Sequence, residues 1–132
     1  MTGQKTSVEL SLPFPPSVNS LYSTNWKTKK RFKSERYETW IKCAINQIPG
    51  GIAGTPLLQG KMIAIYEFGR PDKRRRDVAN YEKAVSDLLT YMFIINDDSL
   101  IEEITLKWAD VEGVRVTLTE IGGMTRQQQS ER

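Results

Sequence analysis

The feature that most constrains the fold is the run from Lys61 to Phe68, in which apolar residues are almost continuous. A short apolar run without alternation is typical of a central strand that is buried on both faces. A second apolar pattern follows at helical spacing, and Asp77 stands where the N-cap of that helix would be. Its stripe consists of Val78, Tyr81, Val85, Leu88 and Met92. A buried strand followed by an amphipathic helix predicts a layered α/β arrangement.

The N-terminal half supplies one more strand and one more helix. Val8–Leu12 alternates apolar and polar residues, as a half-buried strand does, and prolines follow it. The segment Ser17–Lys33 is predicted to be a long basic loop. Ser34 can cap a helix whose apolar residues recur at helical spacing as far as Ile48, and Pro49-Gly50-Gly51 should stop it.

The C-terminal part of the chain reads as a pair of strands. Leu100–Trp108 and Val114–Glu120 are the predicted strands, and a hairpin turn near Asp110–Gly113 is expected to join them. The element order is therefore β-α-β-α-β-β, which predicts an α/β (α+β) fold with a mixed sheet packed by two helices. We expect one domain over residues 1–121 and a polar, disordered tail over 122–132.

Composition removes several classes of chemistry. The chain has 132 residues and no histidine, which excludes His-based general bases, His metal ligands and Ser-His or Cys-His nucleophile systems. Its single cysteine, Cys43, allows no internal disulfide and is predicted to be a small core residue. No apolar run is long enough to span a bilayer, and the N-terminus lacks a signal-peptide core, so we expect a cytoplasmic protein. An enzyme of this composition would rely on carboxylates, lysines and a hard metal ion.

Charge is distributed unevenly along the chain. The 19 basic and 16 acidic residues give a net charge of only +3. Basic residues nevertheless gather in Lys27–Arg36 and Arg70–Arg76, whereas acidic residues dominate Asp97–Glu120. Such a pattern suits a phosphate-binding face beside a metal-binding one. Solvated surface charge explains either basic run taken alone equally well.

Two sets of carboxylates are candidates for metal binding. Asp77 directly follows the basic cluster, although a helix cap is an equally simple role for it. Asp97 and Asp98 form the second set, and adjacent acids in a turn are often only solvated. Together these carboxylates can hold Mg²⁺, which prefers oxygen ligands. Lys83 can then stabilise charge on a phosphate, although a surface ion pair with Asp87 is the simpler reading.

At this point the chain resembles the RusA-type Holliday junction resolvases. The resemblance rests on the proline-rich Leu12–Asn19, on Pro71–Asn80 with Lys83 downstream, and on Asn96-Asp97-Asp98, and it covers nearly the whole chain. It implies a homodimeric, Mg²⁺-dependent endonuclease, with Mn²⁺ as a substitute, that resolves four-way DNA junctions by paired symmetric nicks in recombination and repair. The protein would then be encoded by a bacterium or a phage.

The resemblance also assigns roles to individual residues. The catalytic carboxylates fall on Asp77 and Asp98, and the catalytic lysine falls on Lys83. The basic clusters would contact DNA phosphates, reading shape more than sequence. We expect the nucleic-acid contacts to come from Lys27, Lys29, Lys30, Arg31, Lys73, Arg74, Arg75, Arg76 and Asn80.

Ala79 stands where the family has a further metal-binding aspartate. An alanine cannot coordinate a metal, so we expect this chain to be catalytically impaired but well folded. An engineered inactivation, which we favour, and a natural degenerate site both fit this residue. The main alternative is a non-catalytic protein that binds branched DNA. A small basic RNA-binding protein ranks below it, because the interleaved surface aromatics of single-strand platforms are missing.

Overall fold

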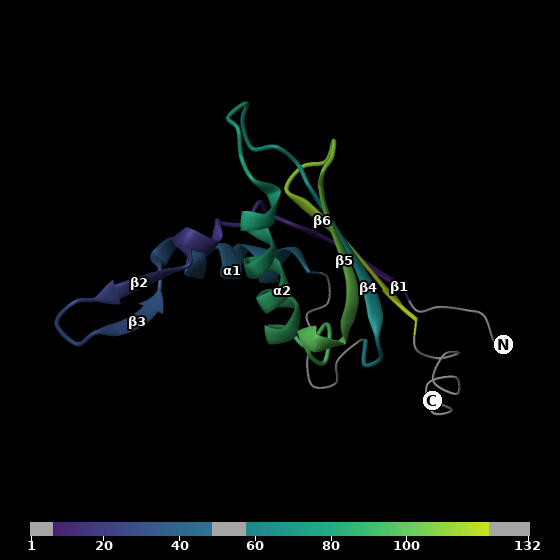
Figure 1. Cartoon of the computed structure of the whole chain (residues 1–132), viewed down its shortest axis with the longest axis horizontal. Helices are drawn as coiled ribbons and strands as arrows, with labels where there is room; N and C mark the ends of the chain where they lie inside the picture. The colour runs from purple at the N-terminus through teal and green to yellow at the C-terminus, as the bar shows by residue number, and fades with distance from the viewer. Residues whose placement is uncertain (1–6, 49–57, 122–132) are drawn as a thin grey trace.

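The chain forms a four-stranded mixed sheet with two α-helices on one of its faces. The computed structural model describes residues 7–48 and 58–121. The strands are β1 (Ser7–Leu12), β4 (Met62–Phe68), β5 (Ile101–Trp108) and β6 (Val114–Glu120), in the spatial order β1-β6-β4-β5 (Figure 1). β4 runs parallel to β5 and antiparallel to β6, which also pairs antiparallel with β1. The predicted fold class and order of the main elements are confirmed, but the predicted hairpin of the last two strands is wrong, because β4 lies between β5 and β6 in the sheet. The predicted tail lies outside the described residues.

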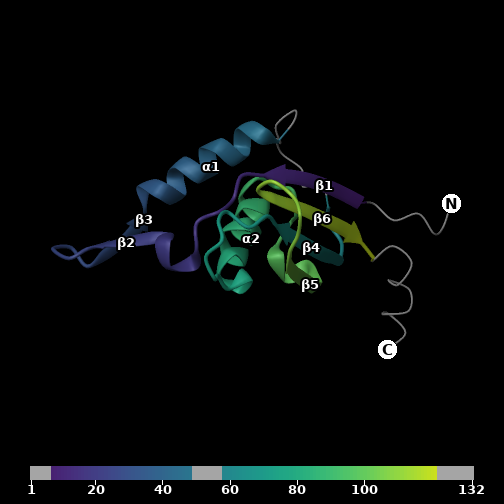
Figure 2. The same cartoon turned by 90° about the horizontal axis from the view of Figure 1, so that it is seen from above.

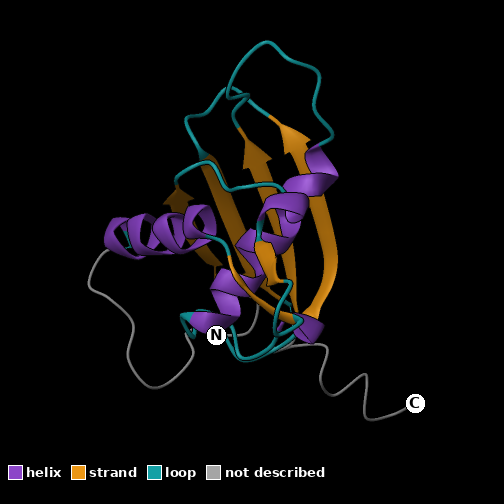
Figure 3. Cartoon of the chain, turned by 90° about the vertical axis from the view of Figure 1, so that its left-hand side faces the viewer, coloured by secondary structure: helices purple, strands orange, loops and turns teal. Residues whose placement is uncertain are grey.

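Both helices, α1 (Glu35–Gln47) and α2 (Glu82–Tyr91), pack on the same face of the sheet (Figures 2 and 3). The β4 residues that face them, Met62, Ala64, Tyr66 and Phe68, have no exposed surface. The residues between them point to the other face and are half-buried. The central position of β4 is thus confirmed, but the prediction that it is buried on both faces is wrong, because no described element covers the second face.

Ser34 caps α1 as predicted. Its hydroxyl accepts the backbone N–H of Tyr37 at 3.1 Å and donates to the carbonyl of Ser20 at 2.6 Å. Trp40 on the buried side donates from Nε1 to the carbonyl of Pro13 at 2.9 Å, which attaches the helix to the chain after β1. Cys43 is exposed, contrary to the prediction, because it lies outside the stripe that turns toward the sheet. The proposed stop at Pro49-Gly50-Gly51 lies outside the described residues.

The segment Ser17–Lys33 is not a plain loop. It contains the short 3-10 helix η1 (Val18–Ser20) and a two-stranded hairpin, β2 (Tyr22–Asn25) with β3 (Lys30–Lys33). The hairpin forms a sheet of its own and projects from the body of the molecule (Figure 1). Both of its faces meet solvent over most of their length, so its strands lack the apolar alternation that identifies a half-buried strand.

Two glycines bring the end of β4 against the turn between β5 and β6. Gly69 donates its N–H to the carbonyl of Gly113 at 2.8 Å, and a Cβ on Gly69 would lie 1.8 Å from the carbonyl oxygen of Val111. Gly113 has a φ of +70°, a conformation that favours glycine. This close approach fixes where the chain leaves β4 toward the basic segment. None of the helices in ranges 7–48 and 58–121 is long and apolar enough to cross a bilayer.

Candidate functional site

Asp77 is placed by a cap at the start of the helical segment. It is the N-cap of the 3-10 helix η2 (Val78–Tyr81), which continues directly into α2. Its Oδ1 accepts the N–H of Ala79 at 3.2 Å, and its carbonyl accepts the N–H of Asn80 at 3.0 Å. The predicted cap is therefore confirmed, although the helix opens with a tighter turn than expected. Because Oδ2 bonds to no described residue and the side chain is exposed, Asp77 can also meet a ligand.

Asp72 organises the basic segment that precedes the cap. Its carboxylate receives Nε of Arg76 at 3.0 Å and NH2 at 2.6 Å, and it also accepts the N–H of Arg74 at 3.0 Å. NH1 of Arg76 donates to the hydroxyl of Tyr81 at 3.2 Å. The guanidinium beside Asp72 lowers the pKa of that carboxyl to about 2. Arg76, which is predicted to contact DNA, anchors the segment through these contacts in the unbound chain.

The other cations of this segment face solvent. Lys73, Arg74 and Arg75 are exposed and form no ion pair with any residue that the structure describes. Arg70 lies with its guanidinium carbon 4.5 Å from the centroid of the Trp108 ring, a cation–π contact that holds it on the body. The segment Arg70–Arg76 projects beyond the end of β4 (Figure 1). It therefore presents Lys73, Arg74 and Arg75 to solvent, while Arg70 and Arg76 are held by contacts within the chain.

A second group of cations lies on the hairpin. Lys27, Lys29, Lys30 and Arg31 are all exposed, and none has an ion pair within the described ranges. Arg31 also covers the ring of Tyr22, with its guanidinium carbon 4.4 Å from the centroid. The hairpin and the segment Arg70–Arg76 project in different directions, so the two basic groups form two separate protrusions rather than one patch (Figure 1).

Lys83 lies one turn after Ala79 on the solvent side of the helical segment. Its Nζ is 3.2 Å from Oδ2 of Asp87, so the predicted surface ion pair is confirmed. The hydrogen bond to Asp87 raises the pKa of Lys83. Lys83 is therefore a cation at neutral pH, suited to neutralising a phosphate and not to removing a proton. Asn80 is half-buried in η2 beside this face.

Asp97 and Asp98 lie just before β5, whereas Asp77 begins a helical segment that packs near the end of that strand. Asp97 caps the 3-10 helix η3 (Asp98–Leu100), accepts the N–H and hydroxyl of Ser99, and has a lowered pKa as a result. η3 leads into the start of β5, whereas Tyr81 of η2 packs on Trp108 at the end of β5 (Figure 1). Eight residues of strand separate these two ends by roughly 23 Å.

The described part of one chain does not bring the predicted carboxylates together as a group of three. No group of three or more Asp, Glu, Cys or His side chains that could hold a metal occurs among residues 7–48 and 58–121. The predicted meeting of Asp77 with Asp98 is not seen in a single chain. The strand order explains this. Asp77 follows β4 while Asp98 precedes β5, and because β4 and β5 are parallel neighbours, these positions come after one end and before the other end of the strand pair.

A buried polar network lies under α2 and was missed by the sequence analysis. The hydroxyls of Tyr66 and Ser86 are 2.9 Å apart, and Ser86 donates to Glu82. Burial raises the pKa of Tyr66, and the nearby carboxylates of Glu82, Asp98 and Asp87 add to that shift. Tyr66 is therefore protonated at neutral pH and holds α2 on β4 rather than taking part in proton transfer. Ser86, directly after Val85 of the apolar stripe, was the signal for this network.

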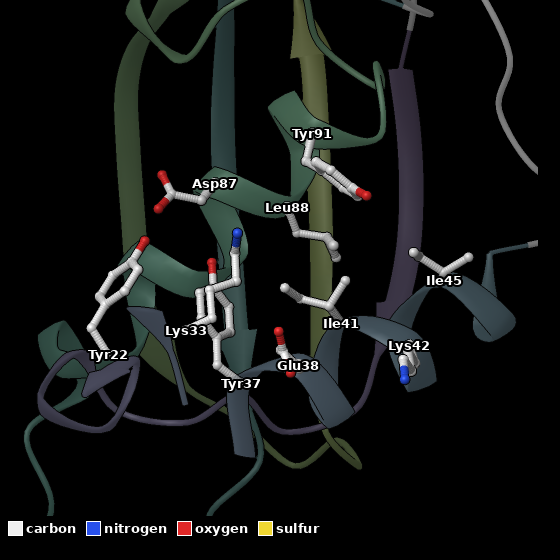
Figure 4. Close-up of a pocket in the computed structure, with 10 residues that line it drawn as sticks. All are labelled: Tyr22, Lys33, Tyr37, Glu38, Ile41, Lys42, Ile45, Asp87, Leu88 and Tyr91. Atoms are coloured by element: carbon white, nitrogen blue, oxygen red, sulfur yellow. The ribbon is translucent and has the colours of Figure 1, made fainter. Parts of the chain in front are cut away.

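One groove of the described chain adjoins Lys83 through its partner Asp87, which lines it. It has a volume of about 490 Å³ and runs between α1 and α2 (Figure 4). Ile41, Ile45 and Leu88 form its apolar wall, and Asp87 and Lys33 stand at its polar end. Asp77 and Asp98 do not line it. The candidate chemistry therefore lies on the open surface, as suits a large polyanion better than a small molecule.

Comparison with known proteins identifies the family to which this chain belongs. A family model described as Endodeoxyribonuclease RusA matches residues 13–119. The chain belongs to the RusA family. The RusA match begins in the proline-rich segment that holds Trp40 and ends in β6, so it takes in the cap, the basic segment and both carboxylate sets. The predicted family is thereby confirmed.

Individual RusA relatives are similar over most of their length. A protein of Enterobacteria phage 82 and one of Escherichia coli strain K12, each named crossover junction endodeoxyribonuclease RusA, are 32% identical over 117 residues. These matches cover 86% of this chain and 94% of each relative. A protein of the same name from Enterobacteria phage HK97 is 30% identical over 110 residues, or 80% of this chain and 82% of the relative. RusA relatives thus come from both bacteria and phages.

Proposed function

We propose that this protein is a structure-selective endonuclease that binds four-way DNA junctions and cuts them by paired nicks during recombination and repair. The observation that carries the proposal is the position of Asp77, capped at the root of the projecting basic segment in a chain of the RusA family. The proposed setting is the cytoplasm of a bacterial cell, because the relatives come from bacteria and their phages.

The two basic protrusions support binding to a branched rather than a linear substrate. Cations of the hairpin and of the segment Arg70–Arg76 point in different directions, so one linear duplex would meet them poorly (Figure 1). The arms of a junction diverge and offer phosphates in both directions. A homodimer with two-fold symmetry would present this pair of protrusions twice, matching the symmetry of a four-way junction.

The separation of the carboxylates also favours a homodimer. Asp77 follows β4 and Asp98 precedes its parallel neighbour β5, so the two residues come at opposite ends of this strand pair. A site that uses both would therefore take one carboxylate from each chain. Their hard oxygen donors suit Mg²⁺ or Mn²⁺. Such a cation, when bound, would polarise a phosphoryl oxygen and activate water. A two-chain site of this kind is part of the proposal, since one chain does not provide it.

The residues of the chain itself have simpler tasks in the proposed reaction. Lys83 would exchange its contact with Asp87 for a phosphate oxygen and neutralise charge there. Lys73, Arg74 and Arg75 would hold the neighbouring phosphates, while the Arg76–Asp72 pair keeps the segment in place. Ala79 leaves this surface one carboxylate short, and we propose that cleavage is weakened for that reason.

The deciding experiment compares the chain with its Ala79→Asp variant on a mobile four-way junction in Mg²⁺. Position 79 is exposed, so the added carboxylate should not disturb folding. We expect nicking to rise by roughly 100-fold or more, a size comparable to the loss of one electrostatic group at an active site. Ala79→Asn is the matched control, because it has nearly the same shape without the charge.

A non-catalytic junction-binding protein is the second candidate. The alanine at position 79 and the lack of a three-carboxylate group among the described residues favour it. The same assay separates the two functions. If Ala79→Asp binds junctions tightly but does not nick them, whichever divalent metal is added, the endonuclease proposal is wrong and the binding function remains.

A further inference from the structure

Trp26 is the most exposed large apolar side chain in the described part of the molecule. Its side chain is 78% exposed, whereas Trp40 is 5% exposed and Trp108 lies among Phe14, Tyr81 and Arg70. Trp26 begins the turn of the β2–β3 hairpin and therefore sits at the outer end of that projection (Figure 1). A large indole in water is a common mark of a binding site.

The turn that carries Trp26 is well ordered by hydrogen bonds. Oδ1 of Asn25 accepts the N–H of Lys27 at 3.0 Å and that of Thr28 at 3.3 Å. The carbonyl of Asn25 accepts the N–H of Lys29 at 2.6 Å, and Lys29 adopts a φ of +63°. Asn25 thus closes the turn around Trp26 by accepting the N–H groups of Lys27, Thr28 and Lys29. The backbone that carries the indole is therefore ordered before binding, which limits the conformational entropy lost when a ligand binds.

The base of the hairpin is attached firmly to the body. Leu21 is fully buried, and its carbonyl accepts the N–H of Ser34 at 2.9 Å. The ring of Tyr22 meets that of Tyr37 edge-on at 5.9 Å. A fixed base and an ordered tip make the hairpin an arm that can carry a side chain to a defined place in a bound molecule.

The charge around the indole identifies the kind of partner. No acidic residue occurs between Leu21 and Ser34, while Lys27, Lys29 and Lys30 surround the tip. Cations beside an exposed aromatic ring suit a nucleic acid, whose phosphates meet the cations and whose bases stack on the ring. A base within a continuous duplex already has both faces covered by its neighbours. A base at a branch point can offer a free face.

We propose that Trp26 recognises the branch point, stacking its indole on a base that the junction leaves unstacked while the hairpin lysines hold the adjacent phosphates. This inference rests on the proposed binding of junction DNA and names the residue that distinguishes a junction from a duplex. The role belongs to recognition, because Trp26 is on the hairpin and Asp77 is on the helical segment.

The test uses the full chain and compares a four-way junction with a linear duplex of the same sequence. Trp26→Ala should weaken junction binding by about 10- to 100-fold, the range expected for one lost stacking contact, and duplex binding by less than about 2-fold. Trp26→Phe, which keeps a ring, should recover most of the junction affinity. Tyr91→Ala is the matched control, since Tyr91 is 67% exposed but lies off the hairpin.

A spectroscopic readout reports the stacking directly. A junction carrying 2-aminopurine at the branch point should show a fluorescence change on binding that Trp26→Ala abolishes, while a probe within an arm should not respond to the variant. Equal losses for junction and duplex, or no loss at all, would overturn the role of Trp26 while leaving junction binding intact. If the unaltered protein does not prefer junctions to duplexes, the proposed function and this inference fall together.

Discussion

The two basic protrusions contain the same kinds of residue but differ in how their charges are held. In the segment Arg70–Arg76, Asp72 binds Arg76 and Trp108 binds Arg70, so part of the positive charge is spent on internal structure. On the hairpin, by contrast, Lys27, Lys29, Lys30 and Arg31 pair with no described carboxylate. The comparison teaches that a count of basic residues overstates the charge available to a ligand where an acidic residue lies within the same turn.

The largest effect should come from removing hairpin charge. The triple change Lys27→Ala, Lys29→Ala and Lys30→Ala should lower the slope of log affinity against log salt by about 2.7, or about 0.9 for each lost phosphate contact. Junction binding measured between about 50 and about 200 mM salt checks this. Lysine-to-arginine changes at the three positions are the control. An unchanged slope would show that the hairpin does not meet phosphates.

A smaller effect should come from the cations of the other protrusion. Arg74→Ala with Arg75→Ala should lower the same slope by about 1.8, because two phosphate contacts are lost. Arg76→Ala should leave the slope nearly unchanged while increasing hydrogen exchange at the Arg74 amide, whose partner Asp72 loses its anchor. If Arg76→Ala reduced the slope as much as either neighbour does, the contrast between anchored and unanchored cations would be wrong.

The smallest effect should come from protonating Asp72, the carboxylate that anchors Arg76, and it should appear only in acid. The pKa of Asp72 is lowered from 3.8 to about 2 by Arg76, so its pairing stabilises the folded segment above about pH 4. That contribution should disappear as the pH falls from about 4 to about 2 and the carboxylate takes up a proton. Carboxyl chemical shifts of Asp72 measured against pH check this. A titration midpoint near 4 would mean that Arg76 is not held in solution.

The regular core of the fold could be predicted because its residues follow simple periods. The strand alternation in Val8–Leu12, the helical stripe after Ser34 and the apolar run of β4 each correspond to an element that the structure contains. The hairpin was missed because neither of its strands faces the core. Its turn also lacks the Asn-Gly or Asp-Gly pair that marks a short hairpin, and uses Asn25 as a side-chain cap instead.

The candidate site was predicted less completely, because residue identity alone does not give pairing. Ala79 and Lys83 are both exposed, and Lys83 pairs with Asp87 four residues later, as helical spacing indicated. The anchoring of Arg76 depends on Asp72 in an irregular turn, where no period applies. The distance of Asp98 from Asp77 depends on β4 and β5 being parallel neighbours, which the element order left undetermined.

The position of β6 in the sheet has a consequence for synthesis. β6 is the last strand in the described part of the chain, yet it lies between β1 and β4 and pairs with both of them. While the chain emerges from the ribosome, β1 therefore has no neighbour until the residues from Val114 onward arrive. A nascent chain can expose its basic segments before its sheet is complete, but it cannot hold them in fixed positions. The proposed grip on branched DNA can therefore become stable only after β6 has been added.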